Sequence, residues 1–346
     1  MNPGFWHNKR VLVTGANGLL GPWLIRDLLT QGATISVLLR DLIPDALFST
    51  EELGKQVTVS FGELENTLLL QRILNEQNID TVFHLGAQAI VGYANRSPIA
   101  TFKSNIEGTW SLLEACRLSP WVKRIIVASS DKAYGSHETL PYTEDAPLQG
   151  HHPYDVSKSC ADLLAQSYYV TYKLPVCITR CGNFFGGGDL HVNRIIPGTI
   201  MAILAGSQPI IRSDGSFIRD YIYVKDVAHA YINLAEQMDK PEIIGQAFNF
   251  STDTPYTVLE LVNRILHLMG TTHLAPIIQN QASNEIPAQH LSSAKAHRML
   301  GWQARYGVEK GLIETIAWYT KYYGQRTNSL PKVSGHEKNI DHLGLL

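Results

Sequence analysis

The chain has 346 residues, of which 45% are hydrophobic and 17% charged, so it has the composition of a globular protein with a sizeable core. Its net charge of −2 offers no basic footprint for nucleic acid, and no apolar run reaches the roughly 18 residues of a membrane span. The first residues lack the features of a secretory signal, and four cysteines make no disulfide framework in so long a chain. We therefore expect a cytoplasmic protein without a membrane or nucleic-acid partner.

The beginning of the chain predicts a dinucleotide site. A short apolar strand over residues 10–14 runs into a glycine turn of spacing G-x-x-G-x-x-G, and an apolar-periodic helix over 23–29 follows. Glycines permit a tight turn and a close approach of the backbone to a pyrophosphate, which the helix N-terminus then faces. The residues expected to contact the cofactor here are Gly15, Asn17, Gly18, Leu19, Leu20 and Gly21.

The second predicted strand, over 34–39, leads into Arg40 and Asp41. An acidic residue near this point commonly bonds the ribose of NAD, whereas an arginine accommodates the 2′-phosphate of NADP. Arg40 therefore favours NADP and Asp41 favours NAD. The alternative is that the two side chains form an exposed ion pair in a loop.

The next part of the chain alternates strands and helices. We expect strands at 57–61, 80–85, 121–130, 175–180 and 247–250, and helices at 67–76, 98–117 and 154–172. Alternation without hairpin signals predicts a doubly wound parallel α/β sheet. Residues that follow the strands, together with one residue of the helix 98–117, are expected at the cofactor, namely Glu63, Leu64, Leu85, Gly86, Ala87, Gln88 and Asn105.

The richest chemistry follows the strand that ends near residue 130. Ser130, Asp131 and Lys132 bring a hydroxyl, a carboxyl and an amine to a strand end, where open α/β sheets bind ligands. Tyr154 and Lys158 lie four residues apart and so share one face of the predicted helix. A lysine beside a phenol lowers the pKa of that phenol, because a positive charge favours the phenolate.

Beyond residue 181 a glycine-rich stretch predicts that the chain leaves the sheet for a smaller α/β lobe. From here to the end of the folded chain the expected helices cover 194–205, 226–236, 257–269 with Thr257 as cap, 292–300 and 308–322. Arg219, inside an aromatic and apolar run, is a candidate diphosphate anchor, with a surface ion pair to Asp220 as the alternative. Thirteen histidines are scattered without ligand spacing, so we expect no metal.

These pieces predict two domains and a tail. We expect a cofactor domain over 1–181 and 226–250, a substrate lobe over 182–225 and 251–324, and a loose polar tail over 325–346.

Four motifs together resemble the extended short-chain dehydrogenase/reductase superfamily, whose Rossmann sheet binds NAD or NADP. They are the glycine turn at 15–21, Ser-Ser-Asp-Lys-x-Tyr-Gly at 129–135, Tyr-x-x-x-Lys at 154–158 and Arg-Asp-Tyr-x-Tyr-Val-x-Asp at 219–226. Within this superfamily the chain is similar to the nucleotide-sugar 4,6-dehydratases over residues 8–322. It most resembles the CDP-glucose 4,6-dehydratases, through Ser-Asp-Lys and Gly-Asn-x-x-Gly-Gly-Gly-Asp at 182–189.

The resemblance implies a role for each catalytic candidate. Tyr154 would take the proton of the sugar's 4-hydroxyl, Lys158 would hold down the pKa of Tyr154 and bond the nicotinamide ribose, and Ser130 would bond the 4-oxygen. Asp131 would protonate the leaving 6-hydroxyl, and Lys132 would remove the C5 proton. A lysine base needs a pKa lowered by burial or by a neighbouring cation.

The resemblance also implies a recycled cofactor, with NAD expected and NADP left open, and a 4-keto-6-deoxy sugar as product. It places Ser129 at the cofactor and Gln88 at both cofactor and sugar. It places Asn183, Arg194 and Arg219 at the nucleotide diphosphate, and predicts a homodimer through the helices 98–117 and 154–172.

Two positions depart from the family pattern, since Gly86 stands where alanine is general and Glu63 where aspartate is usual. The sequence leaves open a 4-epimerase, a decarboxylase or a 4-keto reductase of the same superfamily, and a non-catalytic NAD(P)-binding regulator. Asp131 and Lys132 discriminate between the enzymes, because epimerisation needs only Ser130, Tyr154 and Lys158.

Overall fold

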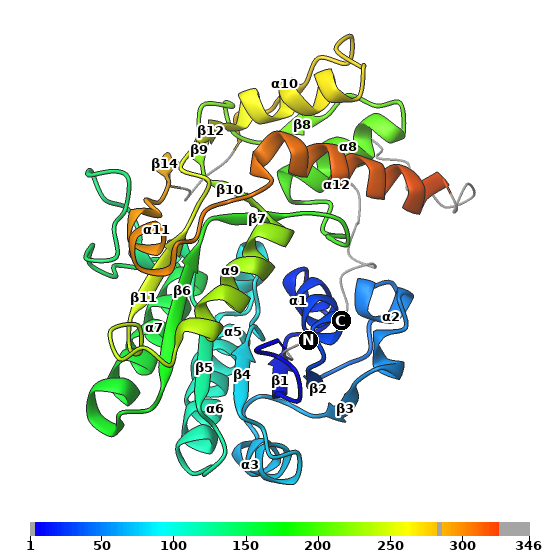
Figure 1. Ribbon diagram of the computed structural model, residues 1–346. Helices are drawn as coiled ribbons and strands as arrows, with labels where there is room; N and C mark the ends of the chain where they lie inside the picture. The colour runs from blue at the N-terminus through cyan, green and yellow to red at the C-terminus, as the bar shows by residue number, and fades with distance from the viewer. Residues whose placement is uncertain (1–3, 282–285, 325–346) are drawn as a thin grey trace.

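A parallel sheet of seven strands forms the centre of the molecule (Figure 1). The computed structural model describes residues 4–281 and 286–324, so the predicted tail lies outside the described residues. The strand order is β3-β2-β1-β4-β5-β6-β11. The bounds are β1 (Arg10–Thr14), β2 (Thr34–Leu39), β3 (Thr58–Phe61), β4 (Thr81–His84), β5 (Arg124–Ala128), β6 (Val176–Cys181) and β11 (Ala247–Phe250). The predicted doubly wound α/β fold is confirmed, and β11 rejoins the first sheet beside β6 as expected.

Helices cover both faces of this sheet, which explains why its central strands carry buried apolar side chains on both faces. Val11 and Val13 of β1 face the core shared with α1 (Leu20–Thr30) and α9 (Val224–Gln237). Leu12, between them, faces the opposite core together with α3 (Thr67–Glu76), α6 (Gly108–Arg117) and α7 (Pro153–Tyr172). The pleat thus sends alternate side chains into two separate cores.

The strand order reverses between β1 and β4, and this reversal positions the site. The chain proceeds from β1 outward to β3 and then returns to β4 on the other side of β1. Connections therefore leave the carboxyl ends of β1 and β4 in opposite directions, and a crevice opens there that binds ligands in sheets of this kind.

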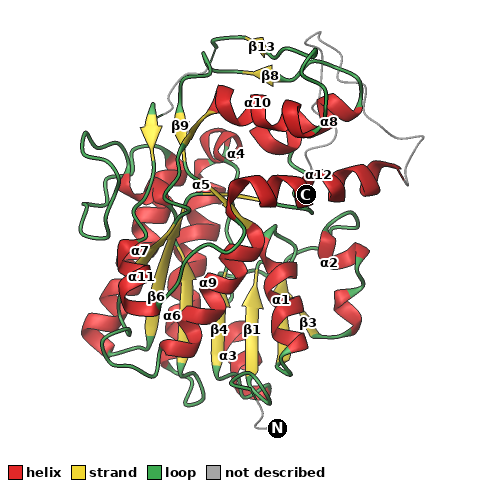
Figure 2. Cartoon of the chain, turned by 45° about the horizontal axis from the view of Figure 1, so that its top comes forward, coloured by secondary structure: helices red, strands yellow, loops and turns green. Residues whose placement is uncertain are grey.

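A smaller group of elements lies above the carboxyl ends of the strands (Figures 1 and 2). Its helices are α8 (Ile195–Leu204), α10 (Val258–Leu268) and α12 (Gly307–Gly324), whereas α11 (Ala294–Leu300) contacts β11 and α9 beside the main sheet. Its strands are β7 (Asn183–Phe185), β8 (Ile210–Ile211), β9 (Ile218–Arg219), β10 (Tyr221–Tyr223), β12 (Tyr256–Thr257), β13 (Ile277–Ile278) and β14 (Ala288–Gln289). Helix α10 begins at a capping box formed by Thr257 and Glu260, which confirms the predicted cap.

The structure differs from the sequence prediction in its short elements. The single helix expected over 98–117 consists of α5 (Pro98–Phe102), a π-helical turn η2 (Lys103–Glu107) and α6. The sequence analysis missed α2 (Leu47–Thr50), η1 (Leu53–Lys55), α4 (Val91–Arg96) and the 3₁₀ turn η3 (Asp131–Tyr134). It also missed the strands of two or three residues, because so short a strand shows no periodicity.

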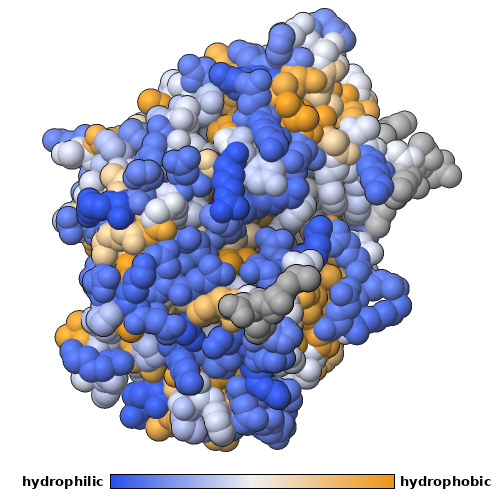
Figure 3. Space-filling model, in the orientation of Figure 1, coloured by the Kyte–Doolittle hydropathy of each residue, from blue (hydrophilic) through white to orange (hydrophobic). Residues whose placement is uncertain are grey.

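The surface agrees with a globular chain. Figure 3 shows a mostly hydrophilic face with separate hydrophobic areas. Within the described residues, no helix combines the length and the apolar character needed to cross a bilayer.

Candidate active site

The turn after β1 leaves no room for side chains at two points. A Cβ at Gly15 would lie 2.7 Å from the backbone nitrogen of Gly86, and Gly15 also has a φ of +75°. A Cβ at Gly21 would lie 2.7 Å from the Cα of Ala16. Bare backbone therefore faces the end of β4 at the N-terminus of α1, where Leu19 and Leu20 begin the helix with Gly18 just before them. This arrangement fits the pyrophosphate of a dinucleotide.

The loop after β2 is tied to this turn. The Asn17 amide donates a hydrogen bond of 2.6 Å to the carbonyl oxygen of Asp41. Arg40 and Asp41 form an ion pair of 2.6 Å whose side chains are 61% and 37% exposed. The pKa of Arg40 is raised, chiefly by the hydrogen bond to Asp41, and the charge of Glu63 adds to the effect. The structure therefore shows the exposed ion pair that the sequence offered as an alternative.

A buried histidine supports the end of β4. The His84 Nδ1 atom lies 2.9 Å from the Thr14 hydroxyl, and its Nε2 atom lies 3.0 Å from the Thr109 hydroxyl. The Thr14 hydroxyl also accepts the backbone N–H of Gly86 at 3.0 Å. Burial, followed by the charge of Lys158, lowers the pKa of His84 to about 3, so the ring is neutral.

Gly86 stands where the family has alanine, and its surroundings are tight. A Cβ there would lie 3.0 Å from the Leu64 side chain and 3.1 Å from the Thr14 hydroxyl. Leu64 also packs against Gly108, where a Cβ would lie 2.7 Å away. The loop Leu85–Gly86–Ala87 thus lies against Leu64, and glycine at 86 accommodates that leucine.

Asn105 holds a loop and has few bonds left to offer a cofactor. Its amide nitrogen donates to the carbonyl oxygen of Gln88 at 3.0 Å and to the Ser157 hydroxyl at 2.8 Å, and its oxygen accepts the Gln88 N–H at 2.7 Å. The Gln88 side chain in turn accepts the N–H of Ile90 at 2.8 Å. The π-helical turn places Asn105 at this loop, a common use of such turns at functional sites. Sequence reasoning missed Ser157.

The catalytic candidates from β5 and its following turn η3 lie together. Ser130 Oγ donates to the Asp131 carboxylate at 2.9 Å and accepts the backbone N–H of Lys132 at 3.1 Å. Asp131 is only 3% exposed, and burial raises the pKa of its carboxyl. Its Oδ1 atom takes the Ser130 bond, whereas its Oδ2 atom is buried and has no hydrogen-bond partner among the described residues.

Tyr154 and Lys158 meet this cluster from the first two turns of α7. Burial raises the pKa of Tyr154 to about 12, and the charge of Asp131 adds to this, whereas a hydrogen bond with Ser130 and the charge of Arg194 lower it. Lys158 Nζ donates to the carbonyl oxygen of Ala128 at 2.8 Å, and burial lowers the pKa of this amine to about 8. The sequence predicted a lowered pKa for Tyr154. In the structure the pKa is raised, because the effect of burial is larger than that of the neighbouring charges.

Lys132 is half-buried and has acidic neighbours. Its charge lowers the pKa of both Asp131 and Asp155, although burial is the larger effect and raises each pKa overall. Acids therefore lie beside Lys132.

The predicted substrate residues lie on the side of the smaller group of elements. The charge of Arg219 acts on Asp131, and the charge of Arg194 acts on Tyr154. Arg194 also forms an ion pair of 2.9 Å with Asp189, and the Asn183 amide donates to the carbonyl oxygen of Asp220 at 3.2 Å. Arg219 is 7% exposed and Asp220 is fully buried, so the alternative of a surface ion pair is wrong.

The sequence analysis missed two polar residues at this site. Gln289 of β14 is fully buried and donates to the carbonyl oxygen of Asp131 at 2.9 Å. It pairs in register with Arg219 of β9. Burial raises the pKa of Asp220 to about 7, and one of its oxygens accepts the N–H of Leu291 at 3.2 Å. Asp220 was visible beside Arg219, but nothing in a two-residue strand pointed to Gln289.

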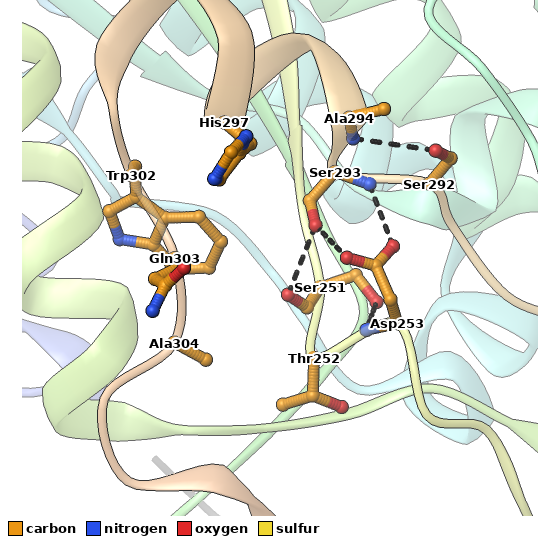
Figure 4. Close-up of a pocket in the computed structure, with 10 residues that line it drawn as sticks. All are labelled: Ser251, Thr252, Asp253, Ser292, Ser293, Ala294, His297, Trp302, Gln303 and Ala304. Carbon is orange, nitrogen blue, oxygen red and sulfur yellow. Dashed lines mark hydrogen bonds between the residues drawn. The ribbon is translucent and has the colours of Figure 1, made fainter.

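A pocket of about 400 Å³ is lined by polar groups that include Ser251, Asp253 and Ser293 (Figure 4). Its polar groups bond to one another, since the Ser293 hydroxyl contacts both Asp253 and Ser251 and the Asp253 N–H donates to Ser251. None of the predicted site residues lines it. Across residues 4–281 and 286–324, no group of three His, Cys, Asp or Glu side chains is placed to hold a metal ion.

A doubly wound sheet, a glycine cradle and an adjoining Ser-Tyr-Lys set define a member of the extended short-chain dehydrogenase/reductase superfamily. A model of the GDP-mannose 4,6 dehydratase family matches residues 12–315. The chain therefore belongs to that family.

Known proteins of this kind cover nearly the whole chain. The CDP-glucose 4,6-dehydratase of Salmonella typhimurium is 29% identical over 334 residues, which are 92% of each chain. The structure of dTDP-glucose 4,6-dehydratase from Bacillus anthracis in complex with NAD has a TM-score of 0.81 and 27% identity, covering 90% of this chain and 97% of that one. A UDP-glucose 4-epimerase from Thermotoga maritima with UDP-glucose has a TM-score of 0.82 and 26% identity, covering 91% and 99%.

Proposed function

We propose that the protein is a nucleotide-sugar 4,6-dehydratase that uses NAD and acts on CDP-glucose or a related nucleoside-diphosphate hexose. The observation that carries this proposal is Asp131, a buried carboxyl with one free oxygen, which accepts the Ser130 hydroxyl and whose charge acts on Tyr154. An acid in that place serves the loss of a hydroxyl and is not needed for hydride transfer alone. The similarity to a CDP-glucose 4,6-dehydratase supports the substrate.

The residues divide the work between two carbons of the sugar. When bound, NAD supplies a hydride acceptor for C4 and a donor for C6, so turnover has no net redox change. Tyr154 takes the proton of the 4-hydroxyl, Ser130 bonds the 4-oxygen, and Lys158 bonds the nicotinamide ribose. Asp131 protonates the leaving 6-hydroxyl, and Lys132 takes the C5 proton and returns it.

The proposal assigns the two parts of the chain to two ligands. Residues 1–181 and 226–250 bind the cofactor, and residues 182–225 and 251–324 hold the nucleotide sugar. Asn183, Arg194 and Arg219 face the diphosphate, whose negative charge suits the two guanidinium groups. On the cofactor side, we assign Ser129, Leu85, Ala87 and Gln88 to contacts with the bound dinucleotide. In the exposed Arg40–Asp41 pair, Asp41 occupies the guanidinium group that the 2′-phosphate of NADP would need, and its carboxylate would repel that phosphate, which supports NAD.

The test is incubation of the protein with CDP-glucose, GDP-mannose, dTDP-glucose and UDP-glucose, followed by mass spectrometry for loss of water. We expect a 4-keto-6-deoxy product from CDP-glucose. The variants Asp131→Asn and Lys132→Ala should each lower its formation by about 10²- to 10⁴-fold, the range for a general acid or base. Full activity in both variants, or no dehydration of any of the four sugars, would refute the proposal.

A 4-epimerase is the second candidate, favoured by the likeness to the Thermotoga maritima epimerase. Epimerisation gives a product of unchanged mass that differs only at C4, so chromatography against UDP-galactose separates it from dehydration. Activity of this kind should survive Asp131→Asn, because it needs only hydride traffic at C4.

We also propose a homodimer. Three apolar side chains on α5 and α7 are well exposed, with Ile99 at 76%, Leu163 at 52% and Val170 at 65%. Exposed apolar side chains on neighbouring helices indicate a surface that another protein chain buries. In a symmetric dimer, α5 and α7 of a second copy would cover these side chains.

A further inference from the structure

A buried ion pair joins strand β6 to helix α7 and takes no part in the chemistry proposed above. Arg180 of β6 binds both carboxylate oxygens of Asp162 on α7, through Nε at 2.8 Å and Nη2 at 2.9 Å. The two side chains are 3% and 0% exposed. Taking two charges out of water is costly, and apolar residues of similar volume often stabilise a fold equally well. Stability alone is therefore a poor reason for this pair.

The arginine of the pair also reaches the turn η3. Its Nη1 atom donates to the Tyr134 hydroxyl at 2.9 Å, and its guanidinium carbon lies 4.9 Å from the centre of the Tyr134 ring. Tyr134 is the last residue of η3, which begins at Asp131. Helix α7 binds this turn directly as well, because the Ser159 hydroxyl donates to the carbonyl oxygen of Ala133 at 2.8 Å. Two separate ties thus join η3 to α7.

The ion pair uses the same face of α7 as the catalytic candidates. Tyr154, Lys158 and Asp162 follow one another at intervals of four residues, so they lie along one side of the helix. Lys158 Nζ donates to the carbonyl oxygen of Ala128 at the end of β5, three residues before η3 begins. The turn that starts with Asp131 is therefore fixed against the helix face that presents Tyr154.

The Tyr134 hydroxyl continues the line of hydrogen bonds to β11. A guanidinium can only donate, so this hydroxyl accepts from Arg180 and its own proton goes to the Asn249 side-chain oxygen at 2.7 Å. Burial raises the pKa of Tyr134 to about 12, which keeps that proton in place. The Asn249 amide nitrogen then donates to the carbonyl oxygen of Tyr142 at 3.0 Å. The line thus runs from α7 through η3 to β11 and on to the loop at Tyr142.

The line closes on Asp131. The Tyr142 backbone bonds twice to the segment that follows β14, since it accepts the N–H of Ser292 and donates to the carbonyl oxygen of His290, each at 2.9 Å. Gln289 at the end of β14 donates to the carbonyl oxygen of Asp131 at 2.9 Å. Both ends of η3 are therefore held by one connected set of bonds.

We propose that Arg180, Tyr134 and Asn249 are positioning residues that hold η3 against α7, so that the acid and base for loss of the 6-hydroxyl stay aligned with the groups that act at C4. A displacement of a reacting group by about 1 Å can cost about 10²-fold in rate. Dehydration draws on Asp131 and Lys132 of η3 itself, whereas C4 oxidation draws mainly on α7. Loosening the turn should therefore slow dehydration more than oxidation. This inference rests on the proposed function.

The test is Tyr134→Phe, which removes the hydroxyl between Arg180 and Asn249 and keeps the ring. Two rates are compared, namely dehydration of the sugar that wild type prefers and C4 oxidation of its 6-deoxy analogue. That analogue has no 6-hydroxyl to lose, so its oxidation is followed by the absorbance of reduced nicotinamide. We expect kcat for dehydration to fall about tenfold or more, while C4 oxidation changes less than about threefold and KM less than about twofold.

A double variant tests whether the residues act through one line. Asn249→Leu should lower the ratio of dehydration to C4 oxidation as Tyr134→Phe does. The two changes together should lower it no further than the stronger single change, because residues in one network are not additive. Independent effects that multiply would contradict a shared line.

Tyr223→Phe is the matched control. Tyr223 is 1% exposed and its hydroxyl donates to Glu314 at 2.8 Å, so the change again removes a buried, bonded phenol hydroxyl. We expect a comparable loss of stability in urea and an unchanged ratio of dehydration to C4 oxidation. Equal losses of both rates in Tyr134→Phe, or a rise in KM alone, would show a purely structural role and overturn the inference.

Hydrogen exchange of the protein alone separates this inference from the proposed function. The N–H groups of Ala133 and Gly135 bond to carbonyl oxygens three residues earlier, at 3.2 and 3.1 Å. Their exchange, followed by mass spectrometry of peptides over 129–136, should be about tenfold faster in Tyr134→Phe and unchanged in Tyr223→Phe. If wild type dehydrates none of the sugars, the proposed function fails, and exchange alone decides whether these residues hold η3. An unchanged exchange rate in Tyr134→Phe would overturn the inference.

Discussion

His84 is a neutral ring that hydrogen bonds to two threonines, Thr14 and Thr109. Thr109 donates its only proton to the carbonyl oxygen of Asn105 at 2.6 Å, so its oxygen must accept from His84 Nε2 at 3.0 Å. His84 Nδ1 is then the acceptor for the Thr14 hydroxyl at 2.9 Å. This tautomer leaves Thr14 free to accept the N–H of Gly86, and so it fixes the loop beside the glycine turn.

The buried ring predicts a loss of stability in acid. The folded pKa of His84, about 3, lies below the ordinary value of 6.5, so the unfolded chain binds the extra proton between these values. The free energy of unfolding should therefore fall as pH falls below 6.5, by about 1.4 kcal/mol per pH unit from this residue. Urea denaturation between pH 6.5 and 4.5 should show a shallower decline in His84→Gln, although that variant is less stable at pH 7. Equal slopes in the two proteins would contradict the prediction.

Gly15, in the turn from β1 to α1, lies against Gly86, in the loop after β4. The two glycines differ in how well the structure can accept a Cβ atom. Gly15 faces the backbone of Gly86 and has a positive φ, so an added Cβ meets atoms that cannot move. Gly86 faces the end of the Leu64 side chain and the Thr14 hydroxyl, and the leucine can turn aside. The ends of β1 and β4 therefore meet at one contact between backbone atoms, which is rigid, and at one contact with a side chain, which can move.

Alanine at each position makes a matched pair. Gly15→Ala should lower the free energy of unfolding by more than about 2 kcal/mol, because strained backbone adds to the clash. It should also lower the affinity for NAD, which titration calorimetry measures. Gly86→Ala should cost less than about 1 kcal/mol and keep NAD binding, since it restores the residue general in the family. Comparable losses in both variants would show that Leu64 cannot move.

At the scale of the molecule, β14 links the smaller group of elements to the catalytic turn. Gln289 donates to Asp131 while its strand pairs with β9, so Arg219, proposed for the diphosphate, and Asp131, the proposed acid, share one support. Helix α7 likewise contributes both to the site and to the surface. Its first turns hold Tyr154 and Lys158 inward, and its later turns expose Leu163 and Val170.

The proposed dimer predicts an effect of charge on α7. Leu163→Asp should convert a dimer to a monomer, because a carboxylate cannot be buried against apolar side chains without a partner. Light scattering after size exclusion at micromolar concentration measures the mass. Leu68→Asp is the control, since Leu68 is 77% exposed on α3 and should leave the mass unchanged. A monomeric wild type, or a dimeric Leu163→Asp, would refute this interface.

The sequence alone determined the sheet, its main helices and the order in which the motifs meet the strand ends. Apolar runs, glycine turns and helical spacing are local signals, and each acts over a dozen residues or fewer. They were enough to place Ser130 and Asp131 at one strand end and Tyr154 and Lys158 on one helix face. Residues 325–346, the predicted tail, lie outside the described part of the chain.

Only the tertiary structure decided the state and support of those side chains. Local spacing placed Lys158 beside Tyr154, yet burial raises the pKa of that phenol, because desolvation depends on everything packed around it. The support of Asp131 by Gln289 joins residues 158 positions apart in sequence, through a strand too short to show a pattern. Sequence therefore determined which groups meet, and long-range packing decided which of them carry a proton.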